Sequence, residues 1–201
     1  DRLSSVLCGH PLTSVYFFSE KLKTFEKVLK GSTVEKVKPR GKALLTSLDS
    51  GYTIYSHNQL YGRWQIVEAG KHPKTKRSLR MALETHSHRA LLFSASDINV
   101  LKSDELPDHP FLAKIGPDIL ESDLTWRIIS KRLTSNRFKN RQLAALFLDQ
   151  SFLAGIGNYL RSEILFDARV NPLKKPKELP RTHNNQISRS TLKICQRAYA
   201  Q

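Results

Sequence analysis

Short alternations of apolar and polar residues fill the first half of the chain. Seven segments have this strand-like pattern, and turn-rich pieces such as "LDSG" and "HSH" separate them. The segments are residues 14–18, 33–38, 42–48, 52–57, 63–69, 79–85 and 89–95. Short strands at such regular spacing are typical of an antiparallel sandwich or barrel. The pattern therefore predicts a mostly β first domain.

The hydrophobic period changes in the second half. Residues 103–118, "SDELPDHPFLAKIGPD", interrupt the alternation with proline, glycine and acidic residues and predict a linker. Apolar residues then recur at helical spacing, in one stripe at Leu124, Ile128, Ile129 and Leu133 and in another at Leu143, Leu146 and Phe147. We expect Ser122 or Asp123 to cap the first of these helices, and a last helix to run from about Asn185. The second domain is therefore predicted to be helical.

Both ends of the chain have helical patterns. Leu3, Val6 and Leu7 are spaced as on one helix face, and Gly9 followed by Pro11 forms a normal helix stop. The last stretch, "STLKICQRAYAQ", is amphipathic and has no terminator, and the chain does not begin with methionine. We expect that the helix at the start of the chain begins in a preceding segment.

Charge indicates the kind of partner. Thirty-three Lys and Arg against 18 Asp and Glu leave a formal charge of +15, and 39% hydrophobic residues are too many for a disordered basic tail. A folded chain with this excess is predicted to bind a polyanion, and nucleic acid is the first choice; added solubility alone is the alternative. No long apolar run or signal peptide directs the chain to a membrane, so a cytoplasmic location is expected.

The two cysteines argue against a metal or disulfide framework. Cys8 and Cys195 stand alone near opposite ends of the chain. This arrangement excludes a C-x-x-C zinc site and a network of disulfides within the chain.

The segment "DQSFLAGIGNYLRSEILF", residues 149–166, predicts an anion-binding corner. One helix should end near Gln150, a glycine turn should cover residues 155–157, and a new helix should start at about Asn158. Glycine lets a phosphate approach the backbone, and the amides of a helix N-terminus supply donors for it. An ordinary helix-turn-helix corner with Asn158 as the N-cap explains the same residues. A dinucleotide-binding loop fits less well because the third glycine is missing.

Three stretches together resemble one family of base-excision repair enzymes. They are "FLAGIGNYLRSEILF", "RGKALL" and "SHNQLYG", and the chain is similar over essentially its whole length to the formamidopyrimidine-DNA glycosylase and endonuclease VIII family. The resemblance implies an α+β fold, with an N-terminal antiparallel β-sandwich domain, residues 1–113, and a helical helix-two-turns-helix domain, residues 114–201. It also implies a monomer that binds damaged double-stranded DNA.

The implied activity is that of a DNA glycosylase with abasic-site lyase activity. In the family, an N-terminal proline amine forms a Schiff base with the damaged nucleotide, and β,δ-elimination then cleaves the strand. No such proline stands at the start of this sequence, so the resemblance implies that it lies upstream of Asp1. A non-catalytic module that binds damaged DNA, and an RNA-binding protein, are the alternatives.

The stretch "SHNQLYG" favours the endonuclease VIII branch, and therefore oxidised pyrimidines as substrates. An enzyme that flips a nucleotide out of the stack must fill the gap, and a polar, apolar and aromatic triplet suits this task. The resemblance implies that Gln59, Leu60 and Tyr61 form this wedge. Without it, Leu60 and Tyr61 would be interpreted as half-buried strand ends.

Lys42, within "RGKALL", has two interpretations. Its position beside a strand pattern indicates a solvated lysine at a strand end. The resemblance instead implies that Lys42 is the acid/base of base excision and β-elimination, because a cation near C1′ can protonate a leaving group.

Other residues are expected in supporting roles. The resemblance implies that Lys114, Gly157 and Asn158 contact the DNA backbone, and Glu163 is expected to orient the turn from within its helix. His57 is expected to be a polar strand residue, and the basic run "KHPKTKR" a mobile solvated loop. The family's zinc belongs to a C-terminal finger that has no counterpart in this sequence, so no metal or other cofactor is predicted on these residues.

Overall fold

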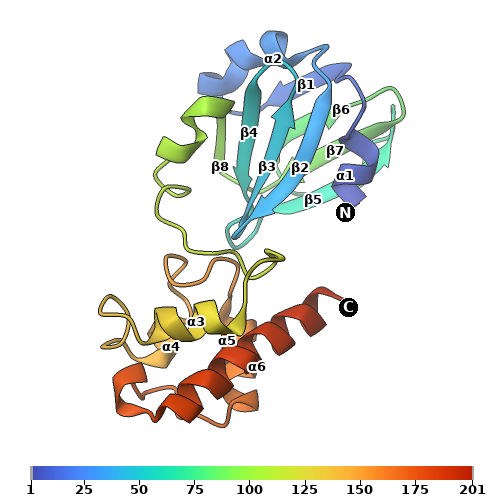
Figure 1. Cartoon of the computed structure of the whole chain (residues 1–201). Coiled ribbons are helices and arrows are strands. Elements are labelled where there is room, and N and C mark those ends of the chain that lie inside the picture. Colours follow the sequence, from blue (N-terminus) through green and yellow to red (C-terminus); the bar gives the residue numbers. More distant parts are fainter. Residues whose placement is uncertain (1, 201) are drawn as a thin grey trace. The chain divides into compact units, whose positions relative to one another are not determined.

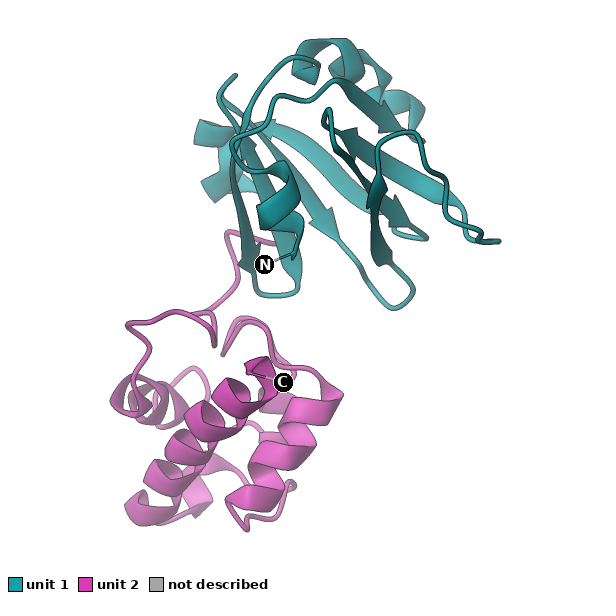
Figure 2. Cartoon of the chain, turned by 90° about the vertical axis from the view of Figure 1, so that its right-hand side faces the viewer, with its two compact units in different colours: residues 1–109 teal, residues 110–201 magenta. Residues whose placement is uncertain are grey.

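The structure is a computed structural model that describes residues 2–200, and it divides into two compact units. Unit 1 is Asp1–His109 and unit 2 is Pro110–Gln201 (Figure 2). Antiparallel sheets make up unit 1 and helices make up unit 2, so the predicted α+β fold is confirmed. The boundary lies inside the predicted linker. The start of that segment is ordered, because Ser103–Asp108 forms the 3-10 helix η2.

Unit 1 consists of two four-stranded antiparallel sheets (Figure 1). One sheet has the order β1-β6-β7-β5 and the other the order β2-β3-β4-β8. The strands are β1 (Ser14–Phe17), β2 (Val34–Arg40), β3 (Ala43–Leu48), β4 (Tyr52–His57), β5 (Arg63–Glu68), β6 (Leu79–Glu84), β7 (His88–Phe93) and β8 (Asp97–Lys102). All seven predicted strands are present. The eighth, β8, was missed because Val100 is its one buried residue, which leaves a weak alternation.

The core of unit 1 lies between the two sheets. Phe17, Met81 and Leu92 contribute from one sheet, and Leu48 and Ile54 contribute from the other. Burial of the face between the sheets gives β1 its alternation, whereas β6 and β7 also bury Ala82, Leu91 and Phe93 on their opposite face.

Two α-helices also belong to the described part of unit 1. The predicted first helix is α1 (Arg2–Leu7), and Gly9 after it has a φ of 78° that glycine adopts at little cost. The second helix, α2 (Lys23–Leu29), was not predicted. It is anchored to the sheet because Glu26 Oε1 accepts a hydrogen bond of 2.7 Å from the backbone amide of Phe17.

Unit 2 contains four α-helices around its own core. They are α3 (Trp126–Leu133), α4 (Leu143–Leu146), α5 (Asn158–Asp167) and α6 (Arg181–Tyr199), with the 3-10 helix η3 (Pro176–Glu178) before α6. The core residues include the predicted Leu124, Ile129, Leu133, Leu143, Leu146 and Phe147. None of the helices in residues 2–200 is long and apolar enough to cross a membrane.

Three details of the predicted helices were wrong. The cap of α3 is Thr125, not Ser122 or Asp123, because Thr125 has extended backbone angles and its Oγ1 accepts a 3.3 Å hydrogen bond from the Ile128 amide. The side chain of Ile128 is 40% exposed, since it lies beside the buried stripe and not on it. Helix α6 begins at Arg181, before the predicted start at Asn185.

Candidate functional site

Lys42 occupies a tight turn at one end of a sheet. Arg40 of β2 pairs directly with Ala43 of β3, so only Gly41 and Lys42 connect the two strands. Gly41 has a φ of 61°, as the first central residue of a type II′ hairpin turn requires. Ala43 is buried and Lys42 is exposed. The turn therefore holds the Lys42 backbone at a fixed point and directs its side chain outward.

Two charged or titratable side chains lie at the same end of the sheet as Lys42. His57 of β4 pairs with Ala43 on one side and with Asp97 of β8 on the other. Burial lowers the pKa of His57, the nearby Asp97 carboxylate raises it, and the charge of Lys42 lowers it further. Lys42 and His57 are therefore close enough for the charge of one to affect the other.

A polar network behind this end of the sheet was not predicted. The Tyr55 hydroxyl donates to Asp97 Oδ2 at 3.3 Å, and Asn99 Nδ2 donates to Asp97 Oδ1 at 3.3 Å. The Tyr55 ring also contacts that of His109, with 4.2 Å between the centroids. Burial raises the pKa of the Tyr55 hydroxyl well above its usual range, which keeps it protonated as a donor. The sequence feature that could have indicated this network is the period of two of a strand, which places Tyr55 and His57 on the same face of β4.

The predicted wedge residues lie in the loop between β4 and β5. The Gly62 amide donates to the Asn58 carbonyl at 2.7 Å, which closes this loop at its base. Gln59 has a φ of 52°, and its Oε1 accepts a hydrogen bond of 2.9 Å from Ser96 Oγ. Leu60 and Tyr61 are 81% and 69% exposed. The interpretation of Leu60 and Tyr61 as half-buried strand ends was wrong.

The basic run "KHPKTKR", residues 71–77, is tied to its surroundings at both ends. Arg77 Nη1 donates to the Tyr61 carbonyl at 2.7 Å, next to the tip of the β4–β5 loop. At the other end, Lys71 pairs with Glu68 at 2.6 Å, and its carbonyl accepts a hydrogen bond of 3.0 Å from Arg89. The residues between are mostly exposed. The run is therefore solvated along its middle, as expected of a solvated loop, and is bonded at its two ends, which the sequence did not indicate.

In unit 2, two side chains shape the turn before α5. Gln150 Nε2 donates to the Ile156 carbonyl at 3.0 Å, and Gln150 Oε1 accepts from the Gly155 amide at 2.9 Å. The Arg132 guanidinium donates to the carbonyls of Ser151 and Phe152, at 2.7 and 2.9 Å. These bonds satisfy backbone groups that have no partner in a helix or strand, and they give the turn a defined shape.

The segment after Lys114 runs against the same turn. The Gly116 amide donates to the Gln150 carbonyl at 2.8 Å. A Cβ on Gly116 would lie 2.6 Å from the Ser151 carbonyl oxygen, so only glycine allows this approach. Lys114 is exposed, shortly before this contact. Packing thus connects the chain around Lys114 to the turn, although the two are far apart in the sequence.

The N-terminus of α5 is open to a ligand. Gly157 is its N-cap, with extended backbone angles and no side chain to bond the first amides. Asn158 is the first residue of the helix and is exposed, so the alternative in which Asn158 is the N-cap was wrong. The unbonded amides and the helix dipole favour an anion at this position. Glu163 is exposed, and within residues 2–200 no hydrogen bond or ion pair is found between it and the turn.

The described residues do not fit the family's zinc. Between residues 2 and 200, no three His, Cys, Asp or Glu side chains gather in a group that could hold a metal ion. Cys8 lies in unit 1 and Cys195 in unit 2, where Cys195 is buried.

Models of known families match both units. The formamidopyrimidine-DNA glycosylase N-terminal domain matches residues 1–96, and the formamidopyrimidine-DNA glycosylase H2TH domain matches residues 115–201. The chain is 46% identical over 200 residues to endonuclease 8 of Shigella flexneri serotype 5b, covering 100% of this chain and 76% of that protein. It is 46% identical over 199 residues to endonuclease 8 of Salmonella schwarzengrund, covering 99% of this chain and 76% of that protein.

Solved structures share the fold. Lactococcus lactis Fpg in complex with DNA that contains an abasic site superimposes with a TM-score of 0.84 at 19% identity, covering 99% of this chain and 74% of that chain. The wild-type Lactococcus lactis Fpg in complex with DNA that contains an oxidised pyrimidine gives the same TM-score and identity, covering 99% and 76%. With both family domains matched in order and near half identity to endonuclease 8 proteins, the chain belongs to the formamidopyrimidine-DNA glycosylase and endonuclease VIII family of DNA-repair glycosylases.

Proposed function

We propose that this protein removes oxidised pyrimidines from duplex DNA and cleaves the strand at the abasic site, as a bifunctional glycosylase and lyase of the endonuclease VIII type. The observation that carries the proposal is the loop between β4 and β5. It presents Leu60 and Tyr61 to solvent from a closed, hydrogen-bonded base. Exposed apolar side chains at a rigid tip suit insertion into a base stack, where they replace the flipped nucleotide. Gln59 completes the wedge.

Lys42 is the proposed acid/base. Its backbone is fixed in the turn at the end of the sheet, and β4, which pairs with β3 there, leads directly into the wedge loop. A lysine at this end can donate a proton to the departing base and then remove one from the sugar during β-elimination. The nucleophile would be the N-terminal proline amine of the family, which is not among these 201 residues. Its imine with C1′ would accept the electron pair that elimination releases.

Unit 2 would hold the DNA backbone. Gly157 and Asn158 stand at the open N-terminus of α5, and Lys114 belongs to the segment that packs on the adjoining turn. Amide donors, an exposed carboxamide and a lysine are groups that proteins use on phosphates. Contacts of this kind position the duplex and do not select the lesion.

Borohydride trapping on abasic DNA tests the mechanism. The protein extended to a Met-Pro-Glu start should form a covalent adduct, and mass spectrometry of the adduct should identify the proline. The Lys42→Ala variant should lose most base excision, since the proton donor is removed. Lys38→Ala is the matched control, because Lys38 is also exposed and lies on the neighbouring strand β2.

The rival function is a module that binds damaged DNA without chemistry. It predicts preference for the abasic duplex and no adduct in the extended protein. Normal base excision by the Lys42→Ala variant would also reject the mechanism proposed here.

A further inference from the structure

Helix α6 carries a row of basic residues that the proposed site does not use. Arg189, Lys193 and Arg197 follow one another at intervals of four along the helix, and all three are exposed. Like charges at this spacing lie side by side and destabilise a helix. Lys193 Nζ pairs with Asp167 Oδ1 at 2.6 Å, and this bond lowers the pKa of Asp167 and keeps it charged. A single carboxylate does not neutralise three basic groups, so the row keeps a positive excess.

An aromatic ring joins this row to α3. The guanidinium groups of Arg127 and Arg189 lie 4.9 and 4.7 Å from the centroid of the Trp126 ring. Cation–π contacts of this kind hold an arginine side chain in place. Next to them, Ser130 Oγ donates to Asn185 Oδ1 at 2.8 Å and connects the two helices. Two arginines that would otherwise repel each other are thus ordered before any ligand binds, which lowers the entropy lost on binding.

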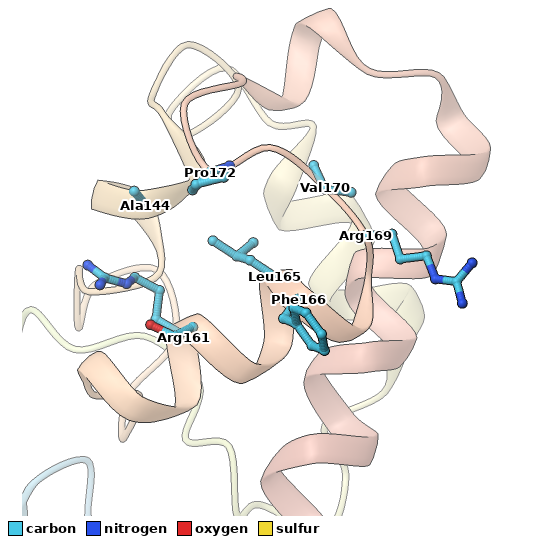
Figure 3. A pocket seen from close by; sticks show the side chains of 8 residues that line it. Ala144, Arg161, Leu165, Phe166, Arg169, Val170 and Pro172 are labelled. Carbon is cyan, nitrogen blue, oxygen red and sulfur yellow. The ribbon is translucent and has the colours of Figure 1, made fainter.

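The row borders a pocket of about 780 Å³ next to the C-terminal end of α5. Every residue around it is polar or charged: Asp167, Arg169, Thr182, Asn185, Gln186, Arg189, Ser190 and Lys193. The neighbouring pocket, of about 520 Å³, is different, because Leu165, Phe166 and Val170 give it an apolar lining. Figure 3 shows Arg169 directing its guanidinium away from that apolar pocket. The polar pocket therefore offers more donors for an anion than its neighbour does, and no apolar residue lines it to receive the anchor residue of a protein partner.

The polar pocket is separate from the turn at Gly157 and Asn158. Helix α5 runs from Asn158 to Asp167, and at 1.5 Å per residue its two ends are about 14 Å apart. One phosphate group cannot contact both ends. A ligand on α6 would therefore use other phosphates than those at the start of α5.

We propose that the basic face formed by Arg127, Arg169, Arg189, Lys193 and Arg197 is a second contact surface for the phosphate backbone of duplex DNA, independent of the lesion. The identification of the polyanion as DNA rests on the proposed function. Arginine, lysine, carboxamide and hydroxyl groups are the side chains that bind phosphate oxygens, and all of them occur in the polar pocket or beside it. The surface would strengthen binding to any duplex and leave recognition of damage to the wedge.

The test measures binding of an undamaged duplex by fluorescence anisotropy over a series of salt concentrations. Each phosphate contact adds about 0.9 to the slope of log affinity against log salt, so the variant Arg189→Gln/Lys193→Gln should lower the slope by about 2. Lys27→Gln/Lys30→Gln removes the same charge from exposed positions at the end of α2 and should change the slope by less than half as much. Arg189→Lys/Lys193→Arg keeps both charges and should keep the slope. Thermal unfolding of each variant shows that the fold is intact.

The ratio of affinities for abasic and undamaged duplex separates this proposal from the proposed function. The basic-face variant should keep that ratio, because it loses contacts common to both duplexes. If the wild-type protein shows no preference for the abasic duplex, the proposed function is rejected. The salt slopes would still test whether the basic face contacts phosphates. A slope in Arg189→Gln/Lys193→Gln equal to that of the α2 control would overturn the basic face.

The phosphates on the basic face could belong to the bound duplex or to a second one. If Arg189→Gln/Lys193→Gln loses affinity for a long duplex but not for a short one that the protein covers completely, the phosphates belong to the flanks of the same duplex. If the variant loses affinity only when a second, unlabelled duplex is present, the phosphates belong to a separate DNA segment. Either result supports the phosphate contact. If the variant loses affinity in neither experiment, the phosphate contact is contradicted.

Discussion

The amide of Gly62 donates a hydrogen bond of 2.7 Å to the carbonyl of Asn58, and this bond closes the loop that carries Leu60 and Tyr61. The approach is so close that a Cβ on Gly62 would lie 2.4 Å from the Asn58 oxygen. The loop backbone therefore has a closed conformation in which two large apolar side chains are exposed to solvent. Exposing apolar surface to water at the tip of a loop costs free energy, and a role in binding explains why the protein exposes it.

Replacing Leu60 and Tyr61 by alanine should reduce discrimination between abasic and undamaged duplex. Loss of a stacked side chain costs about 1–3 kcal/mol, so the affinity ratio should fall by roughly tenfold or more. Salt-dependent binding to undamaged duplex should change little, because it arises from phosphate contacts. Anisotropy titrations with both duplexes measure the ratio. Val28→Ala, at an exposed apolar position on α2, is the control, and an equal loss on both duplexes would contradict the wedge.

Gly62→Ala should destabilise unit 1 and disturb the wedge loop together. The new methyl group overlaps the backbone of Asn58, and the loop must open to relieve the overlap. Gly51→Ala is the comparison, because Gly51 has a φ of 78° and open space around it, so only backbone strain of about 1–2 kcal/mol opposes alanine there. Thermal unfolding should show a larger loss for Gly62→Ala. A smaller loss than for Gly51→Ala would mean that the loop is not held closed.

Asn158→Asp separates a contribution to folding from a phosphate contact. A carboxylate in the first turn of α5 should leave stability unchanged or raise it by about 0.3–1 kcal/mol, through the helix dipole. The same negative charge should weaken binding to every duplex, because it repels the phosphate. Asn158→Ala should weaken binding less. Melting curves and anisotropy test the two effects, and undiminished binding by Asn158→Asp would reject the phosphate contact.

Titration of His57 reports on the position of Lys42. Lys42→Ala should raise the pKa of His57, because a nearby positive charge is removed, and Asp97→Asn should lower it. NMR of the imidazole protons gives both shifts. No change in the Lys42→Ala variant would place the ammonium group too far away for the proposed role.

The same titration predicts how the stability of unit 1 depends on pH. The folded pKa of His57 lies below its unfolded value of 6.5, so the unfolded chain binds the proton more readily. The contribution of His57 to stability is therefore complete above pH 6.5 and is lost as the pH falls through the folded pKa. His57→Gln should flatten this part of the curve of unfolding free energy against pH. An unchanged curve would assign the acid sensitivity to other groups.

Local patterns in the sequence determined the elements that leave a strong periodic signal. A strand with one buried face, such as β1, appears as a period of two, and the glycine turn before Asn158 marks the start of α5. The weakly patterned β8 and the short α2 were missed, since few of their residues are buried. The roles assigned to Lys42 and to the wedge came from family resemblance, because a lysine in a turn carries no local sign of chemistry.

Only the tertiary structure decided which strands are neighbours and how the site is supported. Strand β5 pairs with β7 and not with the consecutive β6, which no local pattern indicates. The hydrogen bonds from Tyr55 to Asp97, and from Arg132 to the turn before α5, also join residues distant in the chain. A periodic pattern records which face of an element is buried. It does not record which element covers that face, because partners are selected by packing and hydrogen bonding across the whole chain.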